Sequence, residues 1–364
     1  MAPSDIFLVL GIVLSFFLSI IVMPIFRSIA IRIGLVDKPD HRKIHQSHIP
    51  LVGGLAIGFT VLLTLLLLAR FELISSALVK LLGGSYVLLI IGAIDDKKDI
   101  RASYKLVVQL LCAIIIAMAG YRLTSFHGIL GIYDISLVAQ YILSVILITG
   151  VINAFNLLDG IDGLAGGLML IGFIILATIS YYIGHEFYTL LCLIVAGSLI
   201  SFLRFNVFSV KLKIFMGDAG SLFLGFLMIG IAIDLINIAS KDAIGAEVIW
   251  LLPLIIAVFI IPVADSLRVY FTRIKNGNSP FKADRSHIHH LFLELGLKQT
   301  KVTFIISMLS LSIVILAFLF HFIWTLDIIL LGIVAILSIM YFILNINKQV
   351  NEWQQKIKQM ESQM

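Results

Sequence analysis

The chain has 364 residues, of which 60% are hydrophobic and only 13% are charged. A soluble domain is about 45–50% apolar and about 25% charged, so this composition excludes a soluble protein and indicates an integral membrane protein. The formal net charge of +5 implies no nucleic-acid partner, because the membrane topology accounts for where the basic residues lie.

Apolar segments of roughly twenty residues recur along the chain, which is the length that an α-helix needs to cross a bilayer. The sequence therefore predicts an all-α, polytopic membrane protein with a single transmembrane domain over 1–346 and a short cytoplasmic C-terminal helix over 347–364. About eleven transmembrane helices are expected, near residues 5–26, 51–69, 73–94, 104–119, 137–157, 164–183, 188–203, 219–238, 247–266, 302–322 and 325–345.

The basic residues predict the orientation, because Arg and Lys resist translocation and accumulate in short cytoplasmic loops. With eleven spans, 22 of the 26 Lys and Arg residues fall on one side of the membrane. We therefore expect the N-terminus outside the cell and the C-terminus in the cytoplasm. The basic residues left for the outer side are Arg70, Lys80, Arg122 and Lys241.

Acidic residues gather on the same predicted cytoplasmic side, and the first group is the IDDKKD stretch at 94–99. Asp and Glu contribute little to topology, so ionisable groups this close to the hydrocarbon are candidates for function. A solvated helix end, in which Lys and Asp pair with each other, is the alternative for IDDKKD. The acids on this side are Asp95, Asp96, Asp99, Asp159, Asp162, Asp218, Asp265 and Asp284.

The next polar stretch is NAFNLLDGIDG at 153–163, at the end of a predicted span. Asn153, Asn156, Asp159 and Asp162 recur every third residue, so on a helix they form one polar stripe. The glycine after each acid suggests that the helix loosens there and lets its backbone approach a ligand. Polar contacts between neighbouring helices are the alternative.

The stretch FMGDAGSLFLG at 215–225 places Asp218 between glycines just before another span. Backbone N–H groups at a helix start bind phosphate oxygens, and a neighbouring carboxylate can hold the divalent ion that neutralises them. A simple N-cap role for Asp218 or Ser221 is the alternative.

The longest basic loop contains NSPFKADRSHIHHLF at 278–292. Its histidines lie beside basic side chains, an arrangement suited to an anionic sugar nucleotide. A zinc site at His287 and His290 is disfavoured, because no Cys or Glu accompanies them at a familiar zinc spacing. Interfacial histidines without a specific role remain the other interpretation. The histidines and basic residues concerned are His287, His289, His290, Arg273, Lys282 and Arg285.

Together, these features predict phosphoryl transfer from a soluble nucleotide to a lipid, with acids to hold Mg²⁺ and cations to hold a diphosphate. A membrane transporter or lipid flippase is the alternative from another class. Transporters place ionisable groups near the bilayer midplane, often in pseudo-symmetric halves, whereas here the acids lie at one face. The acidic motif expected of a CDP-alcohol phosphotransferase is not found.

Five motifs in chain order carry a family resemblance: KPDHRKIHQSHIPLVGG, DDKKD, NAFNLLDGIDGLAGG, FMGDAGS and DRSHIHH. Over roughly residues 30 to 300 the chain resembles the polyprenyl-phosphate N-acetylhexosamine-1-phosphate transferases. Within that family it is most similar to the bacterial enzymes that load N-acetylglucosamine. Transferases of phospho-N-acetylmuramoyl-pentapeptide usually carry three consecutive histidines where this chain has HIHH; they, or a transferase for another UDP-HexNAc, are the alternative.

The resemblance implies a reaction in which UDP-GlcNAc and undecaprenyl phosphate give GlcNAc-diphospho-undecaprenol and UMP, with Mg²⁺ or Mn²⁺ as cofactor. Such an enzyme initiates a bacterial surface glycan, such as O-antigen, enterobacterial common antigen or teichoic acid. It is a multi-pass protein of the bacterial cytoplasmic membrane with its active site facing the cytoplasm. Membrane lipid is a further partner, and a homodimer stays open. Direct attack by the lipid phosphate, already an anion, is favoured over a covalent aspartyl intermediate.

The resemblance also implies roles for individual residues. Asp218 would be the direct metal ligand, and Asp95 and Asp96 would lie close to the metal and to the lipid phosphate. Asp95 would deprotonate or orient that phosphate. Phe215 matches an aromatic residue that stacks on uracil in relatives. The residues expected to take part in catalysis are Asp95, Asp96, Asp159, Asp162, His287 and His290.

Two further sets would bind the donor. The nucleotide pocket would be lined by Asn153, Asn156, Asp159 and Asp162. The diphosphate or the GlcNAc would be held by Arg273, Arg285, His287, His289 and His290. Three residues are supported only by their position in the first cytoplasmic loop, and these are Arg42, Lys43 and His45.

Overall fold

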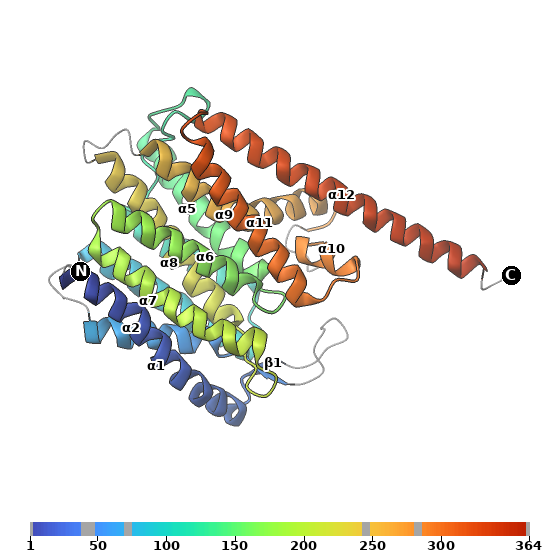
Figure 1. Cartoon of the computed structure of the whole chain (residues 1–364), viewed down its shortest axis with the longest axis horizontal. Coiled ribbons are helices and arrows are strands. Elements are labelled where there is room, and N and C mark those ends of the chain that lie inside the picture. The colour runs from blue at the N-terminus through green and yellow to red at the C-terminus, as the bar shows by residue number, and fades with distance from the viewer. Residues whose placement is uncertain (1–2, 38–47, 69–74, 242–247, 280–285, 362–364) are drawn as a thin grey trace.

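A computed structural model describes residues 3–37, 48–68, 75–241, 248–279 and 286–361 (Figure 1). Apart from a two-residue antiparallel pair, β1 (Val36–Asp37) and β2 (Ile49–Pro50), these ranges are helical or loop. The helices are α1 (Pro3–Ile33), α2 (Gly53–Leu68), α3 (Ser76–Lys98), α4 (Ala102–Met118), α5 (Leu137–Leu158), α6 (Leu164–Tyr182), α7 (Glu186–Leu203), α8 (Gly217–Lys241), α9 (Val248–Lys275), α10 (Ile288–Glu294), α11 (Gln299–Phe320) and α12 (Leu326–Glu361). The all-α prediction is therefore confirmed.

Nine of the helices in the described ranges are long and apolar enough to cross a membrane, which confirms a polytopic membrane protein. The predicted spans at 51–69 and 104–119 are occupied by α2 and α4, apolar helices of 16 and 17 residues. Both are shorter than the roughly twenty residues that a perpendicular span needs. The count of eleven spans and their orientation remain predictions.

The long helices lie side by side with their connections at two ends of the bundle (Figure 1). Helix α8 runs through the middle of the bundle and packs against α3 and α5. Its side chains Phe223 and Phe226 are fully buried in the apolar core. A helix that is apolar all round, as α8 is from Leu222 to Ile233, is expected in such a central position.

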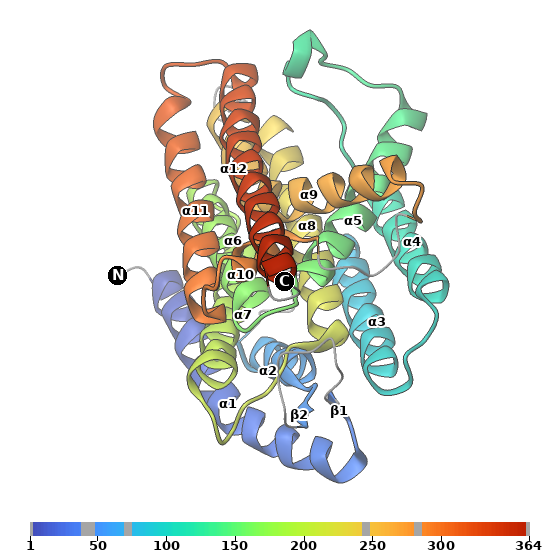
Figure 2. The ribbon, with the colours of Figure 1, turned by 90° about the vertical axis from the view of Figure 1, so that its right-hand side faces the viewer.

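One end of the bundle carries the connections that contain most of the predicted site residues, and we call it the acidic end. It holds β1, β2 and α10, and Figure 2 views it end on. The chain from 119 to 136 and the N-terminus lie at the opposite end. Helix α12 is 36 residues long and extends beyond the acidic end, so the predicted C-terminal tail helix is the continuation of the last span.

Backbone pairing fixes the segment that leads into α8. The Phe215 N–H donates to the Pro50 carbonyl at 2.9 Å, and the Phe215 carbonyl accepts from the Gly53 N–H at 2.8 Å. The chain before α8 is thus held against the start of α2. These bonds satisfy polar backbone groups that would be costly to leave unpaired near a bilayer.

Glycines allow three helices to meet at this point with their backbones in contact. A Cβ atom added to Gly54 of α2 would lie 2.1 Å from the Gly220 nitrogen of α8. A Cβ atom on Gly92 of α3 would lie 2.4 Å from the Ala219 backbone. A larger residue at either glycine would push α8 away, so the PLVGG and IIGAIDD stretches set the position of the α8 N-terminus.

Candidate active site

Two carboxylates from different helices share one ammonium group at the acidic end. Asp95 lies near the end of α3, and Asp218 lies in the first turn of α8. The Lys105 Nζ atom, from the start of α4, is 2.5 Å from Asp95 Oδ2 and 2.6 Å from Asp218 Oδ2. Because both distances end at the same nitrogen, the two carboxylates converge on a single position for a cation.

The neighbouring carboxylate of Asp96 caps the N-terminus of α8. Its Oδ1 atom accepts from the Asp218 N–H at 2.9 Å, and its Oδ2 atom accepts from the Ala219 N–H at 3.2 Å. A carboxylate in this place is also favoured by the helix dipole. Gly217, which opens α8 with a φ of 73°, allows the close approach, since a Cβ there would lie 2.5 Å from Asp96 Oδ2. The cap of α8 thus comes from α3, and Asp218 keeps its carboxylate free to face Lys105.

The polar stripe on α5 divides between two neighbours. The Asn156 amide donates to Asp218 Oδ1 and to Ser221 Oγ, both at 2.9 Å, so it holds the carboxylate that faces Lys105. One turn earlier, the Asn153 amide donates to Gln109 Oε1 of α4 at 2.6 Å. Asn156 therefore belongs to the acidic cluster, whereas Asn153 ties α5 to α4 behind it.

Asp159 and Asp162 follow the end of α5 and lie beside the other acids. Loss of solvation, together with the negative charges of Asp218, Asp96 and Asp162, raises the pKa of Asp159 to about 8. A cation placed among the acids would stabilise the ionised form of Asp159, because it would offset the repulsion from the neighbouring carboxylates.

Asp162 lies at the edge of this cluster, next to the predicted nucleotide-stacking residue. The Lys213 Nζ atom is 2.5 Å from Asp162 Oδ2 and 5.7 Å from the centre of the Phe215 ring. The cation therefore links the acidic turn after α5 to the aromatic ring before α8. The Phe215 side chain is half-buried, which leaves part of its ring accessible.

The histidine segment packs against the same turn. A Cβ atom added to Gly160 would lie 2.6 Å from His289 Nε2, so glycine is required where α10 meets the turn after α5. Burial lowers the pKa of His289 to about 3, with the neighbouring His290 and His287 acting in the same direction. His289 is therefore a neutral imidazole at pH 7 and offers hydrogen bonds rather than a positive charge.

Two further predicted donor-binding residues lie on helices near the acidic end. His290 is half-buried on α10, and Arg273 is buried near the end of α9. The other predicted basic residues lie outside the described ranges, and these are Arg42, Lys43, His45 and Arg285. No contact is described for them.

A divalent cation such as Mg²⁺ requires oxygen ligands that converge on one point. Among the described residues, no three His, Cys, Asp or Glu side chains are placed to ligate one ion by themselves. Mg²⁺ seldom needs such a cage, since it commonly binds one or two carboxylates and completes its shell with substrate phosphates and water. Asp95 and Asp218 fit this pattern, because their oxygens converge where the Lys105 ammonium lies. His287 and His290 are not part of such a cluster.

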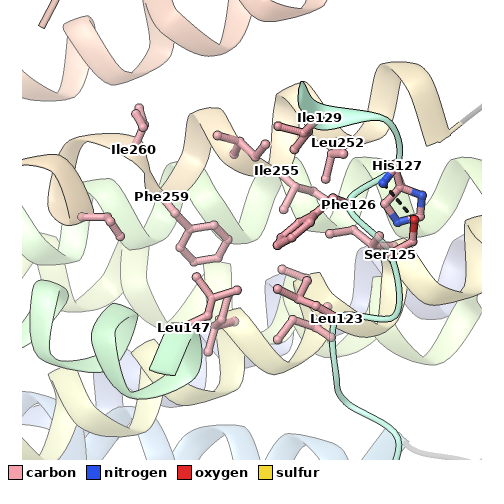
Figure 3. A pocket seen from close by; sticks show the side chains of 16 residues that line it. Leu123, Ser125, Phe126, His127, Ile129, Leu147, Leu252, Ile255, Phe259 and Ile260 are labelled. Atoms are coloured by element: carbon pink, nitrogen blue, oxygen red, sulfur yellow. Dashed lines mark hydrogen bonds between the residues drawn. The ribbon is translucent and has the colours of Figure 1, made fainter. Parts of the chain in front are cut away.

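An apolar cavity of roughly 240 Å³ lies away from the acids (Figure 3). Side chains of α5, α8 and α9 line it together with the chain from 123 to 129, and Phe126 and Phe259 face each other across it. Its polar lining residues are Ser125 and His127. Without a carboxylate, Lys or Arg in its lining, this cavity offers nothing to a diphosphate or a metal, so the polar chemistry belongs to the acidic end.

Sequence reasoning did not assign a site role to Lys105, Lys213 or Ser221. Each lies in or near a motif but outside its acidic residues, and each has at least one contact with a residue far away in the sequence. The sequence could have indicated Lys105, because a lysine in the first turn of an apolar segment is unfavourable near the hydrocarbon unless an acidic partner neutralises it.

Comparison with known proteins places these motifs in a family. The family model described as glycosyl transferase family 4 matches residues 78–236. This range begins in α3 and ends in α8, so it includes Asp95, Asn156, Asp159 and Asp218. The contacts between these residues therefore lie inside the matched range.

Whole-chain relatives extend the similarity. The chain is 33% identical to the undecaprenyl-phosphate alpha-N-acetylglucosaminyl 1-phosphate transferase of Yersinia pestis over 290 residues, which is 78% of this chain and 76% of the relative. It is 32% identical to the protein of the same name from Escherichia coli (strain K12), over 82% of this chain and 80% of the relative. It is also 32% identical to a Bacillus subtilis (strain 168) protein named "Probable undecaprenyl-phosphate N-acetylglucosaminyl 1-phosphate transferase", over 83% and 82%.

Proposed function

Because the chain belongs to glycosyl transferase family 4, a family of phosphotransferase enzymes, we propose that it transfers GlcNAc 1-phosphate from UDP-GlcNAc to undecaprenyl phosphate. The products are UMP and GlcNAc-diphospho-undecaprenol, from which a bacterial surface glycan is built. The names of the relatives support both substrates. Membership of an enzyme family also removes the transporter or flippase alternative.

The observation that carries this proposal is the convergence of Asp95 and Asp218 on one cation position, 2.5 and 2.6 Å from Lys105 Nζ. A phosphoryl transfer between two anions needs concentrated positive charge and fixed positions for the reacting groups. Mg²⁺ or Mn²⁺ held by these two carboxylates would supply that charge at the diphosphate of the donor.

The surrounding residues keep this arrangement in place. Asp96 fixes the start of α8, and Asn156 holds the second oxygen of Asp218, so the Asp218 carboxylate has one preferred orientation. Asp95 is oriented by the Ile100 N–H, which donates to its Oδ1 atom at 2.8 Å. Asp95 can then orient the lipid phosphate for attack. Pre-positioning of this kind is worth several powers of ten in rate.

The nucleotide would lie between the acids and the segment before α8. Phe215 offers a half-buried ring for the uracil, while Lys213 and Asp162 border it. The imidazoles of α10 would contact the sugar or the diphosphate, since α10 packs on the turn that carries Asp159 and Asp162. The acidic end would face the cytoplasm, where UDP-sugars are available.

The test is an assay with purified protein, undecaprenyl phosphate and Mg²⁺, in which UMP and the lipid product are measured for each of several UDP-sugars. We expect turnover with UDP-GlcNAc, and none with UDP-N-acetylmuramoyl-pentapeptide. Preference for the muramoyl donor, or for another UDP-HexNAc, would replace the proposed substrate.

The role of the acidic end is tested in the same assay with Asp218→Asn, which should abolish UMP release in folded protein. Asp134→Asn is the matched control, because it makes the same chemical change at an exposed position in the connection at the opposite end. Full activity of Asp218→Asn would remove Asp218 as a metal ligand. Ping-pong kinetics, or an aspartyl adduct trapped without lipid, would refute direct attack.

A further inference from the structure

A fully buried carboxylate, Asp265, lies in α9 and is not assigned a role by the proposed reaction. Its Oδ2 atom is 2.8 Å from His287 Nδ1. Its Oδ1 atom accepts from the Ile288 N–H at 3.0 Å, from Arg268 Nη2 at 3.0 Å and from the Tyr341 hydroxyl at 3.2 Å. Burying a carboxylate costs free energy, and the four donors around Asp265 offset that cost, so this arrangement indicates a role beyond packing.

These contacts join three elements at the start of α10. Arg268 also donates to the Ser286 carbonyl, and its guanidinium lies 4.6 Å from the centre of the Tyr341 ring. The residues just before and within the first turn of α10 are therefore tied to α9, and α12 supports the tie through Tyr341. Asp265 thus holds the His287 ring through Nδ1.

The hydrogen bond also decides which nitrogen of His287 is free. An ionised carboxylate only accepts, so His287 Nδ1 carries the hydrogen and Nε2 is left facing away from Asp265. Within the described part of the chain, His287 Nε2 is buried without a hydrogen-bond partner, and so is His289 Nδ1. The two rings are parallel within 5°, with their centres 6.0 Å apart. Orphaned nitrogens on two neighbouring rings indicate a polar ligand group, because a buried nitrogen without a hydrogen-bond partner is unfavourable.

We propose that Asp265 is a positioning residue that holds His287 as the Nδ1–H tautomer, so that Nε2 accepts a hydrogen bond from a hydroxyl or amide N–H of the donor sugar. The inference rests on the proposed function for the identity of that sugar. A sugar hydroxyl suits this place, because it can donate to His287 Nε2 and also accept from a neutral neighbouring imidazole such as His289. Asp265 acts through His287 and does not touch the substrate.

The first test uses the wild-type protein and does not depend on activity. Protein labelled with ¹⁵N-histidine should show, for His287, a protonated Nδ1 and an unprotonated Nε2, with the signal assigned by its loss in His287→Gln. Protonation at Nε2 with a bare Nδ1 would overturn the proposal. Because this spectrum needs no substrate, it separates a failure of the tautomer assignment from a failure of the proposed reaction.

The second test is Asp265→Asn, which keeps the side-chain shape but adds an amide donor toward His287 and so permits the opposite tautomer. We expect the ¹⁵N signal to move to protonated Nε2 and the KM for UDP-GlcNAc to rise about tenfold, while the KM for undecaprenyl phosphate stays unchanged. A merely structural role would lower the fraction of active enzyme and leave both KM values as they are. Equal rises in both KM values, or none, would contradict the proposal.

Two further variants complete the design. Ser266→Ala changes the adjacent buried residue on α9, and neither KM value should change. The double variant Asp265→Asn with His287→Gln should be no worse for the donor KM than His287→Gln alone, because both changes remove the same contact. Additive losses would mean that Asp265 acts independently of His287, which would overturn the assignment.

Discussion

Gly217→Ala tests whether the contact between α3 and the start of α8 controls the acidic end. Gly217 has a φ of 73°, and an added Cβ would lie 2.5 Å from Asp96 Oδ2 and 3.0 Å from its Cγ. The left-handed conformation costs a residue with a Cβ about 1–2 kcal/mol. Displacing the Asp96 carboxylate also weakens two charge-assisted hydrogen bonds to the Asp218 and Ala219 N–H groups, each worth about 1.5–3 kcal/mol.

The expected destabilisation for Gly217→Ala is therefore about 4 kcal/mol or more. Two control variants separate the backbone cost from the cost of displacing Asp96. Gly184 has a φ of 76° with nothing within 4 Å of an added Cβ, so Gly184→Ala measures the backbone cost alone. Gly83 lies in α3, also with nothing within 4 Å, so Gly83→Ala should be neutral or stabilising.

The assay is the apparent melting temperature of purified variants in one detergent, measured together with UMP release. We expect the order Gly83→Ala, Gly184→Ala, Gly217→Ala from most to least stable, with loss of activity confined to Gly217→Ala. Asp96→Ala should lower the melting temperature less in the Gly217→Ala background than in wild type, because it also removes the clash between the added Cβ at position 217 and the Asp96 carboxylate. If Gly217→Ala has the same melting temperature as Gly184→Ala and keeps its activity, the close approach of Asp96 to Gly217 contributes nothing to stability or activity, and the reasoning is refuted.

Four other predictions can be checked with the same preparations. Lys105→Met should lower the melting temperature in EDTA and increase the stabilisation by Mg²⁺, since Asp95 and Asp218 then lack their shared cation; an unchanged Mg²⁺ response would contradict this. Phe215→Ala should mainly raise the KM for UDP-GlcNAc, by the loss of stacking worth about 1–3 kcal/mol, and an unchanged KM would refute the stacking role. Asp159 has a pKa raised to about 8, so the folded state binds more protons than the unfolded state between about pH 4 and 8, and wild type loses stability as the pH rises through that window. The melting-temperature advantage of Asp159→Asn in EDTA should therefore grow from pH 5 to pH 8.5, and an advantage independent of pH would argue against the shift. A tag at the C-terminus should be reachable only from the cytoplasm, whereas labelling from outside would invert the topology.

The sequence by itself determined the all-α membrane architecture, because hydrophobic segments of bilayer length can satisfy their backbone only as helices. Each of the eleven predicted spans coincides with a helix, although α2 and α4 are short. The sequence also indicated that Asp95, Asn156, Asp159 and Asp218 belong to one site, because several acids placed at the ends of apolar segments on one side of the membrane are best explained by a shared function. The NAFNLLDGIDG stripe pointed to the end of α5 as part of this group, and Asn156 does contact Asp218.

Only the tertiary structure decided which contacts each of these residues makes. Asp95 and Asp96 are adjacent in sequence, yet one faces Lys105 and the other caps α8, since successive helical residues point in different directions. Asn153 and Asn156 likewise separate, because each faces a different helix. Lys105 and Asp265 each have partners on other helices, and pairings of that kind are set by the packing of the bundle, which no local pattern in the sequence records.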